Sequence, residues 1–426
     1  MNGRQLIALF NDRTVGVVTR DRNGRFKFAY EETWRSAEGA YPLSLSMPLT
    51  AAEHGHRYIE AFLWGLLPDN AQVLDRWARR FQVSPRNPFA LISYVGEDCA
   101  GAVQFIRPDR LNEVTGHGPP AIEWLNEDDV AKRLRTLRAD HAAWRSPSDT
   151  GQFSLAGAQP KTALLFENGR WGVPSGRTPT THILKPPTGE FDGHAENEHV
   201  CLRLASELGL ITANSAVMHF KDEVAIVIER YDRQRTDGRI LRVHQEDLCQ
   251  ALAILPTSKY ENEGGPGIKA SVELIRTVST NAPMDVQNFV DAIAFNWIIG
   301  GTDAHAKNYS LLIGAEGRAR LAPLYDIASI LPYDFDFQRI RLAMKIGGKY
   351  RLRDIGLRQW HNLAGELRLD RDQITRRIHD LAVNLLDVLP TVTNEAKKDG
   401  LDHPLIEKLS SRLEERARHC ISLLRG

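Results

Sequence analysis

Apolar and polar residues alternate along the first hundred positions of the chain. The alternation is clearest in three short segments, 6–10, 14–19 and 25–30, which polar turn residues separate. A period of two residues is typical of strands with one buried face. We therefore predict a small β-rich module over residues 1–106, with a helix between Tyr58 and Phe81 and a closing strand at 101–106.

The pattern changes twice further along. From 107 to 150 the apolar density falls and His117-Gly118-Pro119-Pro120 interrupts the chain, which indicates a connector. Strand-like alternation returns over 151–235. Within it, Asn168-Gly169 separates two alternating segments and predicts a tight hairpin.

Helical periodicity dominates the last part, 236–426. One apolar stripe, with intervals of four residues, consists of Phe289, Ile293 and Trp297. A second stripe, further along the chain, consists of Ile374, Ile378, Leu381 and Leu385. Spacings of three and four place side chains on one face of a helix. The predicted fold class is therefore α+β, with a β-rich part followed by an all-α part.

Composition agrees with a folded protein of two or three structural units. Of 426 residues 42% are hydrophobic, and 54 basic side chains balance 54 acidic ones, which removes the simplest argument for unspecific binding to nucleic acid or membranes. The four cysteines form no Cys-x-x-Cys pair, and the apolar stretches are too short for a signal peptide or a membrane span. These features predict a cytoplasmic protein without a membrane partner.

The most informative segment follows the first helical stripe. Asp303 is followed five residues later by Asn308, and a predicted strand begins at 309. Protein kinases place a catalytic carboxylate and a magnesium-binding amide in this order. By itself, however, this spacing is expected by chance in a chain of this length.

A second carboxylate strengthens the pattern. After the strand 309–313 the chain can turn at Gly314 to Gly317 and return to Asp326. Such a hairpin brings Asp326 beside Asn308, and the carboxylate and amide oxygens would suit a magnesium ion that also binds phosphates. The alternative is that Asp303 and Asp326 only cap turns.

The β-rich part offers groups that could bind phosphate. Residues 154–161 form a loop of small side chains whose backbone amides could approach phosphate oxygens, or else a plain β-turn. Lys185 ends an apolar strand, and Glu198 lies on the inward face of the helix that follows. This pair could aim the lysine at phosphates, as in kinases, or form a structural salt bridge.

A third candidate is the end of the strand 224–228, which leads into Glu229, Arg230 and Tyr231. Backbone groups at such a junction can meet the edge of an adenine, although these residue types do not demand it.

Taken in order, these segments resemble the HipA-type serine/threonine kinase toxins of bacterial type II toxin–antitoxin systems. The likeness extends over nearly the whole chain and includes further segments, at 41–46, 67–70, 178–183, 245–247, 259–261 and 264–267. It implies a two-lobed protein-kinase-like fold, with a β-rich N-lobe, an all-α C-lobe and an extra small N-terminal β-rich subdomain. It also implies ATP and Mg²⁺ between the lobes.

The resemblance implies a role for each candidate residue. It makes Asp303 the catalytic base, Asn308 and Asp326 metal ligands, Glu198 a supporting ion pair and Ser154 the site of autophosphorylation. The implied nucleotide contacts are Ala156, Gly157, Ala158, Gln159, Pro160, Lys161, Lys185, Glu229, Arg230, Tyr231, His305, Ala306, Lys307, Asn308, Tyr325 and Asp326. A phosphoserine at 154 would repel ATP phosphates, which implies self-inactivation.

The implied function is that of a toxin kinase that phosphorylates an aminoacyl-tRNA synthetase and so inhibits translation. The implied partner is a small DNA-binding antitoxin similar to HipB, with DNA contacted only through that complex. Two alternatives are a weak or inactive pseudokinase that acts as a corepressor and a small-molecule kinase of the aminoglycoside phosphotransferase type. Six basic residues between Arg339 and Arg353 could face DNA or form a solvated surface.

Overall fold

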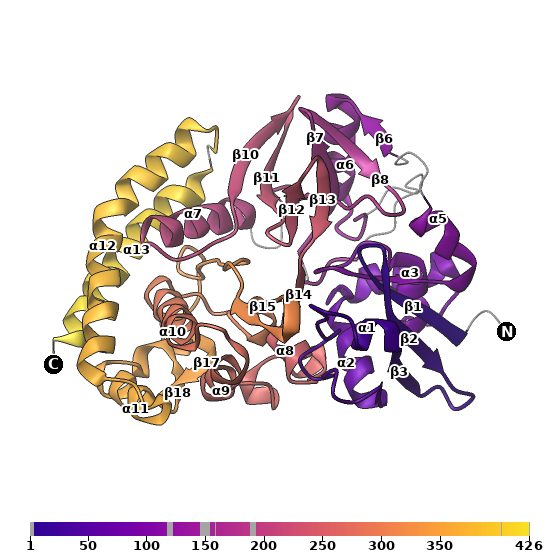
Figure 1. Ribbon diagram of the computed structural model, residues 1–426. Coiled ribbons are helices and arrows are strands. Elements are labelled where there is room, and N and C mark those ends of the chain that lie inside the picture. Colours follow the sequence, from indigo (N-terminus) through magenta and orange to yellow (C-terminus); the bar gives the residue numbers. More distant parts are fainter. Residues whose placement is uncertain are drawn as a thin grey trace. The chain divides into compact units, whose positions relative to one another are not determined.

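The computed structural model describes residues 4–116, 122–144, 154–157, 159–187, 193–401 and 403–425. It contains both helices and sheets (Figure 1), which confirms the mixed α and β class. The chain forms two compact units. The first comprises Met1–Pro186, His219–Thr257 and Leu311–Ala319, and the second comprises Pro187–Met218, Ser258–Ser310 and Arg320–Gly426.

The first sheet of the first unit is built from the alternating segments at the start of the chain. Its strand order is β4-β3-β2-β1-β5, with antiparallel pairing. The strands are β1 (Gln5–Phe10), β2 (Arg13–Arg20), β3 (Phe26–Tyr30), β4 (Glu53–His54) and β5 (Val103–Ile106). The three predicted strands and the closing strand are thus confirmed.

Four helices accompany this sheet, namely α1 (Glu32–Arg35), α2 (His56–Gly65), α3 (Ala71–Phe81) and α4 (Pro88–Val95). The prediction of one helix between Tyr58 and Phe81 is wrong in one respect, because the helix is divided between α2 and α3. The side chain of Asn70 accepts hydrogen bonds from the backbone of Gln72 and Val73. This cap starts a new helix, and Pro68 lies in the break that precedes it.

The second sheet has the strand order β10-β11-β9-β7-β8-β6. Its strands are β6 (Ile122–Leu125), β7 (Thr162–Glu167), β8 (Arg170–Pro174), β9 (His182–Lys185), β10 (Ser215–Phe220) and β11 (Glu223–Glu229). Asn168 and Gly169 join β7 to β8 with φ values of 52° and 75°, the left-handed conformation that a tight hairpin needs. The predicted hairpin is confirmed.

The segment predicted as a connector contributes to this sheet, since β6 pairs with β8 at its edge. It also contains α5 (Leu111–Thr115) and α6 (Glu127–Ala139). Asn126 and Asp129 form a capping box at the start of α6, which is a local signal for a helix within an otherwise polar stretch.

The prediction of an all-α part from residue 236 onward is wrong in detail. Short strands occur there in small sheets, β12 (Arg233–Thr236) with β13 (Arg239–Arg242), β14 (His244–Asp247) with β15 (Ser310–Ile313) and β16 (Ala319–Leu321), and β17 (Arg341–Ile346) with β18 (Lys349–Arg351). Most are hairpins closed by residues with positive φ, such as Asp237-Gly238 and Gly347-Gly348. Their length of three to six residues leaves little periodicity in the sequence.

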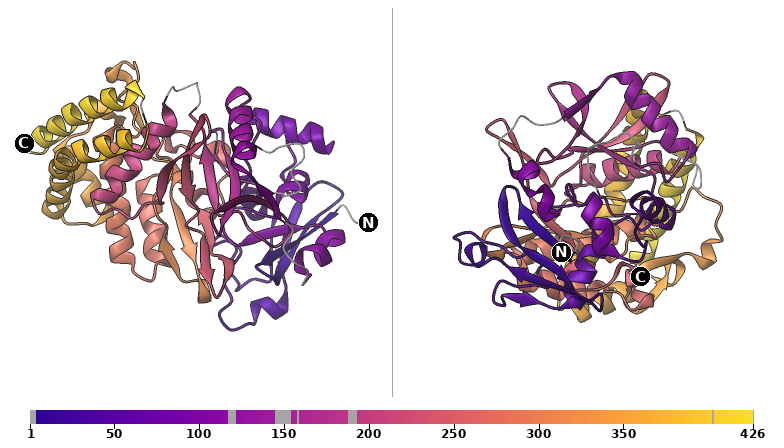
Figure 2. Two further views of the ribbon diagram at one scale, coloured as in Figure 1. Left: turned by 90° about the horizontal axis from the view of Figure 1, so that it is seen from above. Right: turned by 90° about the vertical axis from the view of Figure 1, so that its right-hand side faces the viewer.

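Helices make up most of the second unit. They are α7 (His194–Glu207), α9 (Ile268–Val278), α10 (Ala282–Ile299), α11 (Leu357–Leu367), α12 (Arg371–Lys398) and α13 (Pro404–Leu424), whereas α8 (Leu248–Ala251) belongs to the first unit. In Figures 1 and 2, α12 and α13 lie side by side. The predicted stripe of α10 is buried, and Trp297 packs edge-on against Trp360 with 5.6 Å between ring centroids.

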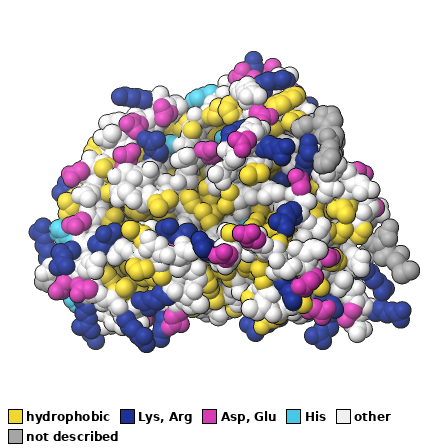
Figure 3. Space-filling view, viewed as in Figure 1, with side chains coloured by type: hydrophobic (Ala, Val, Ile, Leu, Met, Phe, Trp, Pro, Cys, Tyr) yellow, Lys and Arg dark blue, Asp and Glu magenta, His cyan; other side chains and the backbone are white. Residues whose placement is uncertain are grey.

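Short 3-10 turns join these elements, at η2 (Pro108–Arg110), η3 (Pro256–Ser258), η4 (Glu261–Glu263), η5 (Ala306–Asn308), η6 (Ala315–Gly317), η7 (Phe337–Arg339) and η8 (Leu352–Asp354). On the face in Figure 3, basic and acidic side chains are interspersed. Among the helices of the described residues, none combines the length and the apolar character needed to cross a membrane.

Candidate active site

Two glycines direct the chain from the buried helix α10 into the segment that carries Asp303. Gly300 follows the last turn with a φ of 66°, which favours glycine. A Cβ atom on Gly301 would lie only 2.1 Å from Oδ1 of Asn296, and the backbone N–H of Gly301 donates to the carbonyl of Asn296 at 2.7 Å. Side chains larger than hydrogen are therefore excluded where the segment begins.

Asp303 is exposed, whereas the residues that follow it are buried. Its side chain is 70% exposed, while His305 and Asn308 are only 4% and 6% exposed. Ala306 and Lys307 are buried as well. In this segment Asp303 thus presents a carboxylate that solvent and a substrate can reach.

Tyr260 holds the Asp303 carboxylate from a separate turn of the same unit. Its hydroxyl donates to Oδ1 of Asp303 at 2.5 Å, and its ring packs edge-on against His305 with 5.0 Å between centroids. The Nε2 atom of His305 lies 4.0 Å from the same carboxylate oxygen. Glu261 fixes this turn by accepting from the backbone of Lys345 at 2.7 Å.

The residue pattern by itself assigns no function to Tyr260. The segment 259–261 is prominent only through its likeness to HipA-type kinases. No spacing rule connects a tyrosine with a carboxylate 43 positions away.

The hairpin prediction around Asn308 and Asp326 is confirmed in geometry. Strand β15 pairs with β16, and beyond β16 the backbone carbonyl of Asp326 accepts a hydrogen bond from Nδ2 of Asn308 at 3.3 Å. Asp326 has a φ of 55°, an uncommon conformation for a residue other than glycine that often marks a functional position. Tyr325 stabilises the same turn, since its hydroxyl donates to the carbonyl of Lys307 at 2.8 Å.

Asn308 and Asp326 fit a magnesium ion that is bound by protein oxygens and by phosphate oxygens at the same time. The Nδ2 atom of Asn308 donates to the backbone of Asp326, so Oδ1 of Asn308 is the atom that could serve as a ligand, and Asp326, a half-buried residue, could supply a carboxylate oxygen. In the described ranges no group of three or more His, Cys, Asp or Glu side chains is placed to hold a metal. Two protein oxygens beside phosphate oxygens and water are a typical environment of Mg²⁺.

Helix α7 carries Glu198. Asn197, the residue before Glu198, attaches this helix to the rest of the second unit. The amide of Asn197 donates to the carbonyl of Ser329 at 2.7 Å and accepts from its backbone N–H at 2.9 Å. Glu198 is 1% exposed, which confirms that it points inward. Lys185 belongs to the first unit, and the predicted pairing of Lys185 with Glu198 stays a prediction.

The small-residue loop lies in the first unit and is attached to the N-terminal module. Ser154 is completely buried, and its hydroxyl donates to the carbonyl of Leu66 at 2.7 Å. The backbone N–H of Asp69 donates to the carbonyl of Gly157 at 3.1 Å. The backbone N–H of Ser154 donates to the carbonyl of Asp98 at 2.9 Å. Two segments of the module, 66–69 and the one that carries Asp98, therefore hold this loop.

Within the loop, Gly157 has a φ of 104° and Lys161 folds back on its start, donating to the carbonyl of Ala156 at 2.7 Å. Gln159 and Pro160 are half-buried. Ala158, another predicted contact, lies outside the described residues. The loop is thus a closed turn whose backbone conformation depends on glycine.

Lys185 ends β9, which lies between β7 and β11 in the second sheet. It is 5% exposed and stands opposite Ile226 in the register of β9 with β11. A lysine so deeply buried is uncommon unless it has a polar partner. The observed burial therefore disfavours a merely solvated strand end.

The predicted adenine junction leads into a buried cluster of charges. Glu229 is exposed at the end of β11 and Tyr231 is half-buried. The guanidinium of Arg230, in contrast, is enclosed. It donates to Oδ2 of Asp232 at 2.9 Å and to the carbonyl of Cys99 at 2.7 Å. Among the three residues of the predicted adenine junction, Arg230 therefore uses its side chain in structural hydrogen bonds.

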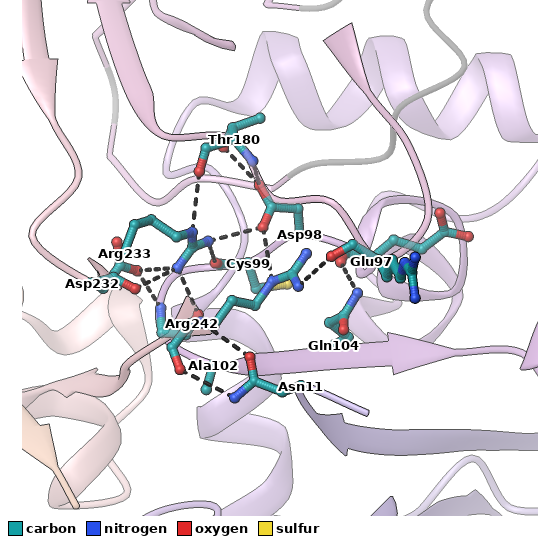
Figure 4. Close-up of polar contacts among 12 residues, drawn as sticks. Asn11, Glu97, Asp98, Cys99, Ala102, Gln104, Thr180, Asp232, Arg233 and Arg242 are labelled. Carbon is teal, nitrogen blue, oxygen red and sulfur yellow. Dashed lines mark hydrogen bonds and ion pairs between the residues drawn. The ribbon is translucent and has the colours of Figure 1, made fainter. Parts of the chain in front are cut away.

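Asp98 lies at the centre of this cluster (Figure 4). Its carboxylate accepts hydrogen bonds from four side chains, those of Arg230 at 3.3 Å, Arg233 at 2.8 Å, Arg242 at 3.3 Å and Thr180 at 2.6 Å. Burial alone would raise the pKa of Asp98, but the three guanidinium groups, led by Arg233, outweigh it and hold this pKa well below its usual range. The buried carboxylate therefore stays ionised.

An exposed Asp303, the Asn308–Asp326 pair and a buried lysine on a central strand are the elements of a phosphotransferase of the kinase class. The family model of the HipA-like C-terminal domain matches residues 153–389, and that of the HipA N-terminal domain matches residues 6–106. The chain therefore belongs to the HipA family, and we class it as a serine/threonine kinase.

Individual relatives support this assignment to the family. A putative kinase, Y4mE, of Sinorhizobium fredii is 37% identical over 98% of this chain and 99% of its own length. The serine/threonine-protein kinase toxin HipA of Shewanella oneidensis is 30% identical over 90% of both chains. A solved structure of the Shewanella oneidensis HipA, HipB and operator DNA complex matches 99% of this chain and 98% of its counterpart, with a TM-score of 0.84 and 26% identity.

Proposed function

We propose that this protein is an ATP- and Mg²⁺-dependent serine/threonine protein kinase and the toxin of a HipBA-like toxin–antitoxin module. The observation that carries the kinase proposal is the exposed Asp303 carboxylate, which accepts a hydrogen bond from the Tyr260 hydroxyl at 2.5 Å and precedes the hydrogen-bonded pair of Asn308 and Asp326 in the chain. This is the order expected of a catalytic base followed by two metal ligands.

In this proposal each residue keeps the role that the sequence implies. Asp303 accepts the proton of the substrate hydroxyl, and Asn308 and Asp326 would hold Mg²⁺, which would neutralise charge on the phosphates. The loop 154–161 and Lys185 would bind the phosphates, and Glu198 would orient Lys185. Backbone groups of Glu229 to Tyr231 would meet the adenine, and His305, Ala306, Lys307 and Tyr325 would shape the nucleotide site.

The proposed domain organisation follows the same reasoning. It comprises an N-terminal subdomain (1–106), a connector (107–150), a kinase N-lobe (151–235) and a C-lobe (236–426), with ATP between the lobes. Support comes from the two family models, which divide the chain in the same region.

The biological role is proposed from the relatives. A small DNA-binding antitoxin similar to HipB would be the partner, since the matched structure contains HipB and operator DNA. Any DNA contact, including one by the basic segment 339–353, would be made in that complex. An aminoacyl-tRNA synthetase would be the substrate, its phosphorylation would inhibit translation in the cytoplasm, and phosphorylation of Ser154 would end the activity.

A decisive experiment incubates the purified protein and a bacterial lysate with labelled ATP and Mg²⁺ and identifies phosphopeptides by mass spectrometry. Wild type should yield phosphoserine or phosphothreonine on a synthetase, and Asp303→Asn should yield none, because the amide cannot accept the proton. Asp372→Asn, a change of an exposed acid on α12, is the matched control and should retain the activity.

The same experiment distinguishes the alternatives. Binding of antitoxin without any transfer by wild type would favour the pseudokinase that acts as a corepressor. Transfer to an amino sugar instead of a protein would favour the small-molecule kinase.

A further inference from the structure

The N-terminal module reaches three separate segments of the proposed nucleotide site through one residue. Asp98 lies in the range matched by the HipA N-terminal model, whereas Ser154, Thr180 and Arg230 lie in the range matched by the C-terminal model. All four belong to the first compact unit. The contacts of Asp98 therefore join two family domains within one folded body.

The first segment is the loop 154–161. The carbonyl of Asp98 accepts from the backbone N–H of Ser154 at 2.9 Å, which places the start of the loop. The second segment leads into β9 and Lys185. The Asp98 carboxylate accepts from the backbone N–H of Thr180 at 3.0 Å and from its hydroxyl at 2.6 Å. These two bonds fix the chain just before the strand that carries the lysine.

The third segment is the junction at the end of β11. Arg230 donates from its backbone to the carbonyl of Thr181 at 2.9 Å and from its side chain to Asp98 and to the hydroxyl of Thr180. Arg233 donates to Asp98 at 2.8 Å and to the carbonyl of Thr180 at 3.1 Å. The turn that carries Glu229 and Tyr231 is therefore held on the same carboxylate.

The close approach of the module is built into the backbone. The N–H of Gly101 donates to Oδ2 of Asp232 at 2.7 Å. Gly101 has a φ of 79°, and a Cβ atom there would lie 2.8 Å from backbone atoms of Gln245. Only a glycine at position 101 allows the segment 98–101 to approach Asp232 and Gln245 this closely.

We propose that Asp98 is a positioning residue of the nucleotide site, through which the N-terminal module sets the relative placement of the phosphate loop, the Lys185 strand and the adenine junction. This inference rests on the proposed ATP-dependent function and assigns to the N-terminal module a part in ATP binding. The buried Asp98 would act without contacting the nucleotide itself. Its effect is transmitted by Thr180, Arg230 and the Ser154 backbone.

The charge of Asp98 is what the arrangement needs. Three buried guanidinium groups face Asp98 and Asp232, so an uncharged residue at 98 would leave three cations against one carboxylate. Buried charges that lose their partner are strongly unfavourable. In Asp98→Asn the arginines are therefore expected to move, and the segments that they hold would move with them.

The test compares kinetics and stability of full-length variants. For Asp98→Asn the KM for ATP should rise about tenfold while kcat at saturating ATP changes less than about twofold, because the chemistry lies elsewhere. The dissociation constant of a fluorescent ATP analogue with Mg²⁺ should rise in parallel. If the substitution only reduced the fraction of protein that is folded, the apparent kcat would fall and the KM for ATP would not change.

Glu97→Gln is the matched control. Glu97 is the neighbouring residue, is also buried, and pairs at 2.6 Å with Arg110, which lies outside the three segments. This variant should lower the melting temperature and leave the KM for ATP unchanged. A KM raised equally in both variants would show a general effect of destabilising the module and would overturn the inference.

A second variant keeps the proposal testable if Asp98→Asn folds poorly. Asp98→Asn combined with Arg242→Gln removes one surplus cation, and Arg242 contacts the cluster through Asp98. The double variant should recover thermal stability and keep the raised KM. Recovery of both, or a wild-type KM in folded Asp98→Asn, would refute the positioning role. Wild-type protein that binds no ATP would refute the proposed function and this inference with it.

Discussion

Glu246 shows how one buried side chain can govern the response to pH. It is 1% exposed on β14, and one carboxylate oxygen accepts from the backbone N–H of Leu45 at 2.7 Å. Burial raises its pKa from 4.5 to about 8. The folded state thus keeps a proton that the unfolded chain releases. The resulting stability is fully present below about pH 4.5 and is lost as the pH rises to about 8.

Glu246→Gln should therefore become more stabilising, relative to wild type, as the pH rises from 5 to 8. The amide imitates the protonated acid at every pH, and the difference should grow by about 1 kcal/mol for each pH unit. Thermal unfolding of both proteins at several pH values measures it. The comparison cancels other titrating groups, such as the buried His244. A difference that does not change with pH would contradict the prediction.

Tyr260 is the residue for which catalysis offers the most direct test. Tyr260→Phe removes the hydrogen bond to Asp303 and keeps the ring against His305. The value of kcat should fall about threefold to tenfold, as expected for the loss of a typical hydrogen bond worth about 0.5–1.5 kcal/mol, and the KM for ATP should not change. Tyr350→Phe, on β18 of the same unit, is the control. Equal kcat values in both variants would exclude an orienting role.

At the scale of elements, Ser154 makes the phosphate loop sensitive to charge. Its hydroxyl lies in a fully buried position against the carbonyl of Leu66. Ser154→Ala loses only that hydrogen bond and should bind ATP within about twofold of wild type. Ser154→Asp places a carboxylate against a carbonyl oxygen and should release the loop from the module.

A fluorescent ATP analogue and limited proteolysis of the loop measure the two effects. We expect partly weakened binding and faster cleavage for Ser154→Asp, since one charge imitates the two of a phosphoserine incompletely. Slow cleavage together with wild-type affinity would show that the loop tolerates charge. The inhibitory role proposed for Ser154 would then have to be abandoned.

Elements with local signals could be predicted from the sequence. The Asn168-Gly169 turn and the hairpin that returns Asp326 to Asn308 follow from glycine positions and alternation over a few residues. The strands β12, β13, β17 and β18 are too short for such a pattern. The apolar positions on either side of the Asn70 cap predict one helix where the structure has α2 and α3.

The missed parts of the site depend on contacts between distant positions. Asp98 and Arg230 are 132 residues apart, and Tyr260 and Asp303 are 43 apart. The residue types alone would suit a solvated surface, so only the folded chain shows that they meet. The resemblance implies that Arg230 contacts the nucleotide, and its side chain forms hydrogen bonds inside the first unit.

At the scale of the whole molecule, the N-terminal module and the remainder of the first unit depend on each other. Residues 107–426 without the module would lose Asp98 opposite three arginines and Leu66 opposite Ser154. They would also lose the hydrogen bond from the backbone N–H of Glu316 to the carbonyl of Ala40, at 3.0 Å. In the first two cases, groups that are buried in the complete protein would lose their partners.

We therefore expect residues 107–426 to be insoluble or unfolded when produced alone and soluble when co-produced with residues 1–106. Solubility and circular dichroism of the two preparations measure this dependence. The control is full-length Glu97→Gln, which weakens the module but keeps the cluster. A truncated chain with a cooperative melting transition would contradict the expectation.

The Asp98 cluster also constrains how such a chain can diverge. Asp98, in the first quarter of the sequence, pairs with arginines that lie more than a hundred positions later. If the charge of the acid or of the arginines changed alone, a buried charge would be left without a partner. Descendants should inherit the two parts as a pair. A chimera that joins the N-terminal module of one relative to the kinase region of another should fold only where both parents carry the same pattern of charges at these positions.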